Sequence, residues 1–273
     1  MEVLRQSSFY TMVKRGDNRL QAETIYLSTS EEAVGWIEAR TGSLLIEDAG
    51  CSVLRRAGEQ VNEAHPLPGL IGAEAHLGAG SEIARVVSRD DWLKRELMNE
   101  CVKGIIQAET FLFSERGYAS LRDYENYWKQ YQLNSCRRFS HLERTTRGWA
   151  DHVGVALRDT YLFNRSKTCS VSRGMDGEME AVGSFIDSFH EMGGRLSLSP
   201  EGRITGCSAN LLRAPDRVCF EGPELLSPLV GQNVRGLGKK QVALLAGGRQ
   251  NCTHLIDLVY ELCRASAEAV GVT

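Results

Sequence analysis

The stretch GCSANLLRA, at residues Gly206–Ala214, decides the fold because an earlier stretch of the chain resembles it. GCSVLRRA, at Gly50–Ala57, begins with the same three residues and also ends in arginine and alanine. Leu70-Ile71-Gly72 follows the first stretch and Leu229-Val230-Gly231 follows the second, each after a loop that contains proline. Similar strings that recur in the same order indicate a duplicated unit. Chance similarity between short strings is the alternative.

Both halves carry the patterns of antiparallel strands followed by a helix. Turn sequences at 15–18 and at 199–202 each separate two strand-like segments, which predicts two hairpins. We expect strands at 2–13, 20–29, 32–39, 43–54, 180–189 and within 195–212. Residues 153–172 are expected to form either one long strand or two short strands with a break near 164–165. We expect helices from Asp90 or Asp91 to about 114 and from 251 to about 267, mainly loop at 58–80, and short segments at 81–87 and 238–245.

These patterns predict an α+β fold with two related lobes of mainly antiparallel sheet, each closed by a C-terminal helix. The first lobe covers residues 1–114, a helical aromatic-rich bridge covers 115–151, and the second lobe covers 152–273. Lys103 follows the early helix cysteine of the first half where His254 follows that of the second. The first lobe is therefore interpreted as a degenerate copy, and the second lobe carries the candidate site.

The bridge has aromatic residues at helical spacing, namely Tyr124, Tyr127, Trp128 and Tyr131. Such a stripe is typical of an amphipathic helix that packs on a neighbour. A subunit interface of a homo-oligomer such as a homodimer, and a lid over the site, are the alternatives. A nucleic-acid platform would also combine aromatic and basic residues, but the mildly acidic chain disfavours it and we expect no nucleic-acid partner.

The composition is that of an ordinary globular protein. Of 273 residues, 42% are apolar and 25% are charged, and the net charge is −3. No apolar run is long enough to span a bilayer, so we expect no membrane association. The first five residues, Met1 to Arg5, lack the hydrophobic core of a signal peptide, and we expect a cytoplasmic location.

Eight cysteines are present and none forms a C-x-x-C pair. Zinc ribbons, thioredoxin-like redox motifs and cysteine-ligated haem therefore lack their signatures. Most of these thiols are expected to be buried as small hydrophobes.

The most chemical stretch is GGRQNCTHLID, at residues 247–257, where a thiol and an imidazole open the last helix. Asn251 is a suitable N-cap, which would make Cys252 the first helical residue and lower the pKa of its thiol. Asp257, three residues after His254, is placed to orient that imidazole. Cys252 and His254 are only two residues apart, so a regular helix would point them to different sides.

The second lobe resembles a bacterial family catalogued only as domain-of-unknown-function family 2889. The likeness rests on Phe189-His190-Glu191-Met192, on Pro215-Asp216-Arg217-Val218-Cys219 and on Cys252-Thr253-His254-Leu255, in this order. Asn251 replaces the glycine that the family has before its Cys-Thr-His-Leu string. The resemblance covers about a third of the chain, supplies no activity, and implies that His190, Glu191, Cys219, Cys252 and His254 belong to one set.

Two chemistries fit this set, and a purely structural role is the third interpretation. In the first, Cys219, Cys252 and His254, with His190 or Glu191, bind zinc or iron and leave one position open. In the second, Cys252 is a nucleophile with His190 or His254 as base. Glu191 or Asp257 would orient that base.

We therefore expect a cytoplasmic small-molecule enzyme with its site in the second lobe. It would be a metal-assisted or thiol-dependent hydrolase or lyase acting on an acyl or carboxylate-bearing metabolite. No nucleotide cofactor is expected, because the glycine-rich run before Lys239-Lys240 lacks the following Ser or Thr of a phosphate loop. The alternative is a non-catalytic ligand-binding or scaffold protein that assembles through residues 115–150.

Overall fold

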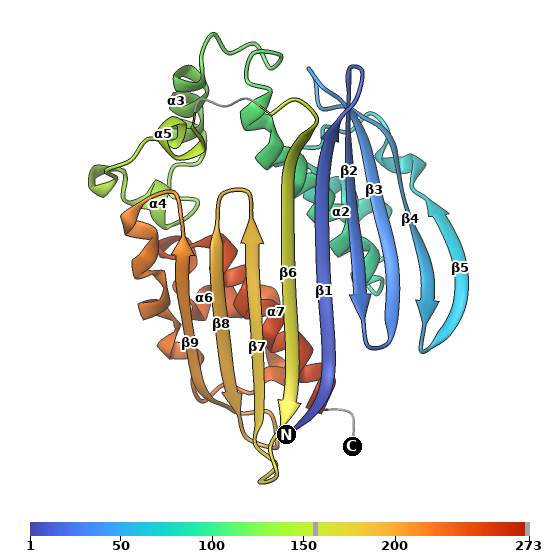
Figure 1. The fold of residues 1–273 in the computed structure, drawn as a ribbon, viewed down its shortest axis with the longest axis vertical. Coiled ribbons are helices and arrows are strands. Elements are labelled where there is room, and N and C mark those ends of the chain that lie inside the picture. The colour runs from blue at the N-terminus through green and yellow to red at the C-terminus, as the bar shows by residue number, and fades with distance from the viewer. Residues whose placement is uncertain (155–157, 271–273) are drawn as a thin grey trace. The chain divides into compact units, whose positions relative to one another are not determined.

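A computed structural model describes residues 1–154 and 158–270 (Figure 1). The strands are β1 (Glu2–Arg15), β2 (Arg19–Ser28), β3 (Glu31–Arg40), β4 (Ile46–Arg56), β5 (Glu59–Pro66), β6 (Tyr161–Arg173), β7 (Met179–Asp187), β8 (Glu191–Leu198) and β9 (Ile204–Arg213). The α-helices are α1 (Ala79–Val86), α2 (Trp92–Ala108), α3 (Leu121–Tyr131), α4 (Arg137–Ser140), α5 (Trp149–Val153), α6 (Lys239–Leu245) and α7 (Thr253–Val270). Short 3-10 turns occupy 68–70, 109–111, 142–144, 217–229, 234–236 and 248–250.

The fold is α+β, and its nine strands hydrogen-bond in the order β5-β4-β3-β2-β1-β6-β7-β8-β9. They form one antiparallel sheet, whereas separate sheets in two lobes were expected. The sequence patterns located the individual strands but carried no information on which strands of different halves would pair, because pairing of distant strands depends on long-range contacts.

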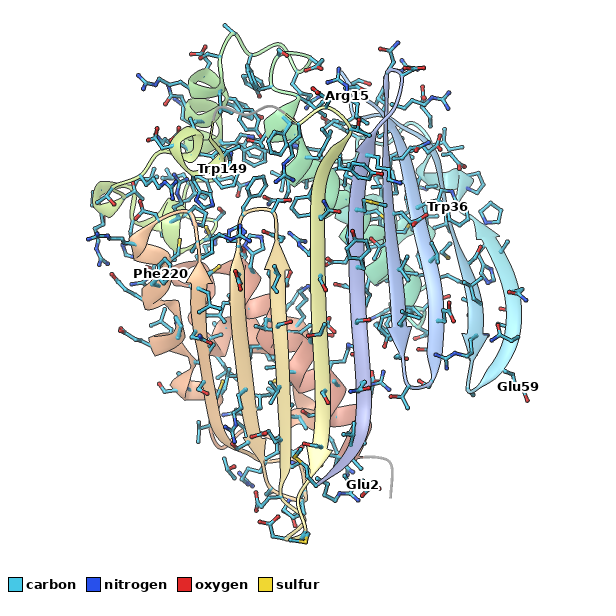
Figure 2. All side chains as sticks on the ribbon, in the orientation of Figure 1. Glu2, Arg15, Trp36, Glu59, Trp149 and Phe220 are labelled. Carbon is cyan, nitrogen blue, oxygen red and sulfur yellow. The ribbon has the colours of Figure 1, made fainter. Side chains whose placement is uncertain are left out.

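The chain divides into two compact units, and β1 and β6 contribute residues to both. We call residues 8–124 and 155–166 the N-terminal unit. Here α2 packs on β2 and β3 (Figure 1). The approach is close at Gly35, where an added Cβ would lie 2.7 Å from Cβ of Leu97. Trp36, labelled in Figure 2, points to the other face of β3 and donates its indole N–H to Asp48 at 2.8 Å.

The C-terminal unit consists of residues 1–7, 125–154 and 167–273. Here α7 packs on β7 and β8 (Figure 1). Leu258 and Leu262 of α7 lie against Gly183 and Gly194, where an added Cβ would come within 3.0 to 3.3 Å of their side chains. The buried apolar core of this unit surrounds that contact.

Several local predictions are confirmed, and one is wrong. The hairpins, the helix start at Asp91 and the last helix are confirmed, and Asp91 accepts a hydrogen bond from the backbone N–H of Lys94 at 3.3 Å. The predicted loop at 58–80 contains β5, an edge strand whose mostly exposed residues lack apolar alternation. Of the two alternatives for 153–172, the single long strand is the one observed, since β6 runs without interruption from Tyr161 to Arg173.

The two units share an element order and one irregularity of strand pairing. Glu32 lies opposite Arg55, but the next residue of β3 lies opposite Val53. In the same way Glu191 lies opposite Arg213, but the next residue of β8 lies opposite Leu211. A β-bulge therefore directly precedes Arg55 in the N-terminal unit and Arg213 in the C-terminal unit.

The short strings that suggested a duplication do not occupy matching positions. Cys51 pairs with Gly35, the residue beneath α2, whereas Cys207 pairs with Leu196, two residues beyond Gly194. Cys101 lies near the middle of α2 and not at its start. The duplication stays a prediction, and the bulge and the element order favour it more than the strings do.

Within the two described ranges, none of the helices combines the length and the hydropathy that crossing a bilayer requires.

Candidate functional site

The site begins where the apolar face of β7 ends. The buried residues of this strand alternate, and this face comprises Met179, Ala181, Gly183, Phe185 and Asp187. Alternation places all of them toward α7, as the contact of Gly183 with Leu262 shows. The last of them is a carboxylate that is 4% exposed. A buried carboxylate is costly unless it is hydrogen-bonded or bound to a cation.

The carboxylate of Asp187 organises the turn between β7 and β8. Its Oδ1 accepts the backbone N–H groups of Phe189 at 2.8 Å and of His190 at 2.7 Å. The imidazole of His190, 5% exposed, lies with Nδ1 3.1 Å from the same oxygen. This Asx-type turn fixes the carboxylate and the imidazole relative to each other.

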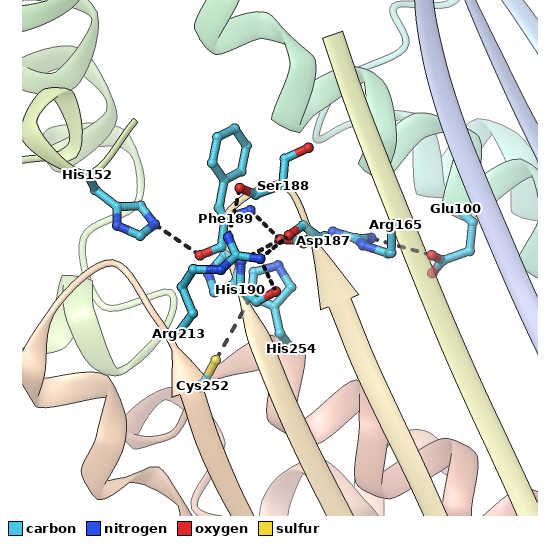
Figure 3. A network of polar contacts seen from close by, with 10 residues as sticks. All are labelled: Glu100, His152, Arg165, Asp187, Ser188, Phe189, His190, Arg213, Cys252 and His254. Carbon is cyan, nitrogen blue, oxygen red and sulfur yellow. Dashed lines mark hydrogen bonds and ion pairs between the residues drawn. The ribbon is translucent and has the colours of Figure 1, made fainter. Parts of the chain in front are cut away.

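The start of α7 brings a second imidazole to this turn. The rings of His190 and His254 lie 4.0 Å apart between centroids, at an interplanar angle of 35°. Phe185 contacts the same ring of His254, with centroids 5.2 Å apart. One ligand atom from each of Asp187, His190 and His254 lies within 4.8 Å of the others (Figure 3). We call these three residues the Asp-His-His cluster.

The cluster fits a divalent transition metal. Imidazole and carboxylate ligands suit zinc and iron(II), and three protein ligands leave positions for water or substrate. Ligands that share a metal at about 2.1 Å lie about 3.4 Å apart in tetrahedral geometry. The 4.8 Å limit of the cluster therefore requires only a small inward movement of side chains.

A third histidine lies on the backbone of the same turn. Nε2 of His152, in α5, lies 2.9 Å from the carbonyl oxygen of Phe189. That carbonyl only accepts, so Nε2 carries the proton. Burial, together with the positive charges of Arg147 and Arg213 and with His190, lowers the pKa of His152 to about 4. This ring is therefore neutral at pH 7.

The thiol of Cys252 lies beside the cluster but is not poised as an anion. Its Sγ is 3.9 Å from Nδ1 of His254. The side chain is buried, and this desolvation raises the pKa of the thiol well above its usual value. The predicted lowering of this pKa by the helix start is therefore wrong, because desolvation outweighs the backbone N–H groups.

The predicted N-cap is also displaced by one residue. The helix α7 begins at Thr253, and its first intrahelical bond runs from the N–H of Ile256 to the carbonyl of Cys252 at 3.0 Å. The amide of Asn251 instead donates to the carbonyl of Ala246 at 2.7 Å. Cys252 itself is thus the capping residue.

The remaining predicted site residues lie elsewhere around the cluster. Cys219 is buried, which raises the pKa of its thiol to about 11, and it does not belong to the group of ligand atoms within 4.8 Å. Glu191 is the first residue of β8, and alternation with the buried Met192 places it on the opposite face of the sheet from that residue. Asp257 forms an ion pair with Nζ of Lys239 at 2.9 Å.

Sequence reasoning missed Asp187. The signal was available, because Asp187 stands in phase with the apolar residues Met179, Ala181 and Phe185 of an alternating strand. A charged residue at an inward position of such a strand marks a buried polar site.

The comparisons with known proteins agree with the resemblance seen in the sequence. Residues 163–268 match the family described as "Protein of unknown function (DUF2889)". The matched range includes all three residues of the Asp-His-His cluster. No curated protein and no solved structure matched the chain.

Proposed function

We propose that the C-terminal unit is the catalytic part of a small-molecule enzyme, a metal-assisted hydrolase or lyase. The observation that carries this proposal is the convergence of one carboxylate and two imidazoles of the Asp-His-His cluster. Zinc or iron(II) is the metal that these ligand types favour. A metal in such a site polarises a substrate oxygen and acidifies bound water.

The surroundings of the cluster support a reactive centre more than a purely structural one. Two of its three residues are buried, which strengthens electrostatic interactions with a bound charge. Phe185 contributes apolar surface beside the imidazole of His254, with ring centroids 5.2 Å apart. An acyl or carboxylate-bearing metabolite would present to this centre a carbonyl oxygen that a metal can polarise.

The thiol-dependent route is the weaker of the two chemistries. The buried thiol of Cys252 has a raised pKa, and the thiolate is the nucleophilic form. A metal-free route that uses His190 is better supported than the thiol-dependent route. Nδ1 of His190 lies 3.1 Å from Asp187, an arrangement that would orient the imidazole as a general base. This second candidate uses the same residues for hydrolysis or elimination.

Metal analysis of the purified protein tests the proposal. We expect close to one zinc or iron per chain in the wild type, and loss of that metal in Asp187→Asn, His190→Gln and His254→Gln. His65→Ala is the control, because His65 lies in β5 of the N-terminal unit and its loss should leave the metal content unchanged.

Two results would contradict the metal assignment. The first is that metal-free protein takes up neither Zn²⁺ nor Fe²⁺ on dialysis. The second is that all three variants keep wild-type metal content. The metal-free His190 route, and the non-catalytic scaffold that assembles through residues 115–150, would then be the remaining candidates.

A further inference from the structure

The backbone of the turn that carries Asp187 and His190 is held by side chains from outside the turn. The guanidinium of Arg213, the last residue of β9, donates from Nη1 to the carbonyl of Ser188 at 2.8 Å. Its Nη2 donates to the carbonyls of Asp187 at 2.7 Å and His190 at 3.2 Å. One side chain thus satisfies three of the four carbonyls of the turn (Figure 3).

The fourth carbonyl has its own donor. Phe189 accepts from Nε2 of His152 at 2.9 Å, and its ring packs edge-on against Trp149 at 4.9 Å between centroids. Both partners belong to α5. Every carbonyl from 187 to 190 is therefore bound by a side chain.

The segment that supplies His152 is itself anchored to this unit. The carboxylate of Asp216 accepts the backbone N–H groups of Thr146 at 2.8 Å and Arg147 at 2.7 Å. Nε of Arg137 donates to the carbonyl of Val218 at 2.7 Å. These contacts hold the chain just before α5 in place, so His152 is a fixed donor.

We infer that Arg213 and His152 are positioning residues that preset the Asp-His-His cluster for its ligand. Two of the three ligand side chains leave the same four-residue turn, so the turn conformation sets the distance between the carboxylate and the imidazole. The guanidinium is a rigid planar fork of donors, which fixes three carbonyls at once. Partners of this outer kind commonly contribute about 10- to 100-fold to metal affinity. The inference rests on the proposed metal-binding function of the cluster.

The chain offers a matched control for the arginine. In the N-terminal unit Arg55 holds the turn between β2 and β3 with the same three bonds. It donates to the carbonyls of Ser28 at 2.7 Å, Thr29 at 3.3 Å and Glu31 at 3.3 Å. This turn carries no Asp-His-His cluster, so loss of Arg55 removes a like set of bonds without disturbing the ligands.

The experiment measures Co²⁺ affinity and the visible Co²⁺ spectrum of the full chain, with chelator competition, for Arg213→Lys and Arg55→Lys. We expect Arg213→Lys to bind Co²⁺ about 10- to 100-fold more weakly with an altered spectrum. Arg55→Lys should keep wild-type affinity and spectrum. Circular dichroism and thermal melting of the metal-free proteins verify that both variants fold.

A second pair of variants keeps the test decisive if Arg213→Lys does not fold. His152→Gln retains an N–H donor for the carbonyl of Phe189 and should stay close to the wild type. His152→Phe removes that donor and should weaken Co²⁺ binding several-fold.

If the folded wild type binds Co²⁺, either of two outcomes overturns the positioning role while the metal-binding function stands. One is an Arg213→Lys variant with wild-type affinity and spectrum. The other, if that variant does not fold, is equal affinity in the two His152 variants. A wild type that binds no Co²⁺ overturns both the metal-dependent function and this inference, so the two failures are distinguishable.

Discussion

The turn between β2 and β3 and the turn between β7 and β8 are built alike but carry different chemistry. Oγ of Ser28 accepts the backbone N–H groups of Ser30 at 3.3 Å and Glu31 at 2.9 Å. Oδ1 of Asp187 accepts those of the second and third residues after it in the same way. Arg55 near the end of β4 and Arg213 at the end of β9 then each bind three carbonyls of the corresponding turn. The backbone device is common to both units.

The side chains that surround the two turns differ at each position of the cluster. Ser28 occupies the position in the β2–β3 turn that Asp187 occupies in the β7–β8 turn, and Glu31 occupies the position of His190. Leu93 lies four residues before Leu97, the leucine packed on Gly35, as His254 lies four before Leu258. A hydroxyl, a carboxylate and an alkyl group do not make a site for zinc or iron.

The N-terminal unit instead has a cavity of about 430 Å³ at the place of the cluster. Glu31, Trp92, Leu93 and Lys94 are among its lining residues, and Lys94 pairs with Asp91 at 2.7 Å. The comparison teaches that the same backbone architecture can carry different side chains, and that the Asp-His-His cluster lies in the C-terminal unit.

An exchange between the turns has the largest expected effect. Asp187→Ser should keep the turn, because a serine hydroxyl accepts the same two N–H groups at Ser28. It removes the carboxylate ligand, and we expect metal affinity to fall by at least about 100-fold, or about 2.7 kcal/mol. Chelator competition measures this loss. The reciprocal variant Ser28→Asp should leave the metal content unchanged. If Asp187→Ser bound metal with wild-type affinity, the carboxylate would not be the feature that distinguishes the two turns.

The second-largest expected effect is a loss of stability when the glycines beneath α2 and α7 are replaced by alanine. Gly35→Ala places a Cβ 2.7 Å from Cβ of Leu97, an atom fixed to the helix backbone, and should destabilise the protein by about 2 to 3 kcal/mol. Gly194→Ala places it 3.2 Å from the flexible end of Leu262, and should cost less than about 1 kcal/mol. Urea unfolding monitored by circular dichroism measures both. Equal costs would mean that the two helices pack with the same tolerance.

His152, the α5 residue that binds the carbonyl of Phe189, predicts a pH dependence of stability. The folded-state pKa of His152, about 4, lies below the value of about 6.5 in an unfolded chain. The unfolded state therefore binds the proton first, and stability is lost as the pH falls from about 6.5 to 4. We expect His152→Gln to lose less stability than the wild type over this range. Parallel pH profiles of the two proteins would contradict the buried neutral ring.

The smallest effect concerns Cys101 within α2 and Cys252 at the start of α7. Burial raises the pKa of Cys101 to about 12, and burial also raises that of Cys252. Neither thiol should react with iodoacetamide at pH 8 in the folded protein, whereas both should react in urea. Mass spectrometry of tryptic peptides reports this directly. Rapid labelling of Cys252 in the folded state would revive the thiol-dependent chemistry.

Much of the fold was predictable because its signals are local. Alternation and turn residues located β1, β2, β8 and β9, and helical periodicity located α2 and α7. The single sheet was not predictable, because the pairing of strands from different halves leaves no local trace. The edge strand β5 was missed because its exposed residues resemble a loop.

The site was predicted in part for the same reason. His190 and His254 were selected as members of one set, and the structure brings their rings together. Their catalytic role stays a prediction. Asp187 was not selected, because its importance depends on the direction of its side chain and not on a motif. The prediction of a lowered pKa for the Cys252 thiol was wrong because it assumed that the helix start is exposed to solvent, whereas Cys252 is buried.

The bulge in β9 makes Leu212 a spacer residue in the backbone. This residue has no partner in the register with β8, and it is 64% exposed. Its side chain adds little packing, yet its backbone is the spacer that turns Arg213 toward the carbonyls at 2.7 to 3.2 Å. The geometry therefore requires a residue at this position but not a leucine side chain. Substitutions of Leu212 should be neutral. Deletion of this residue should remove the contacts of Arg213 with the turn and so disturb the Asp-His-His cluster.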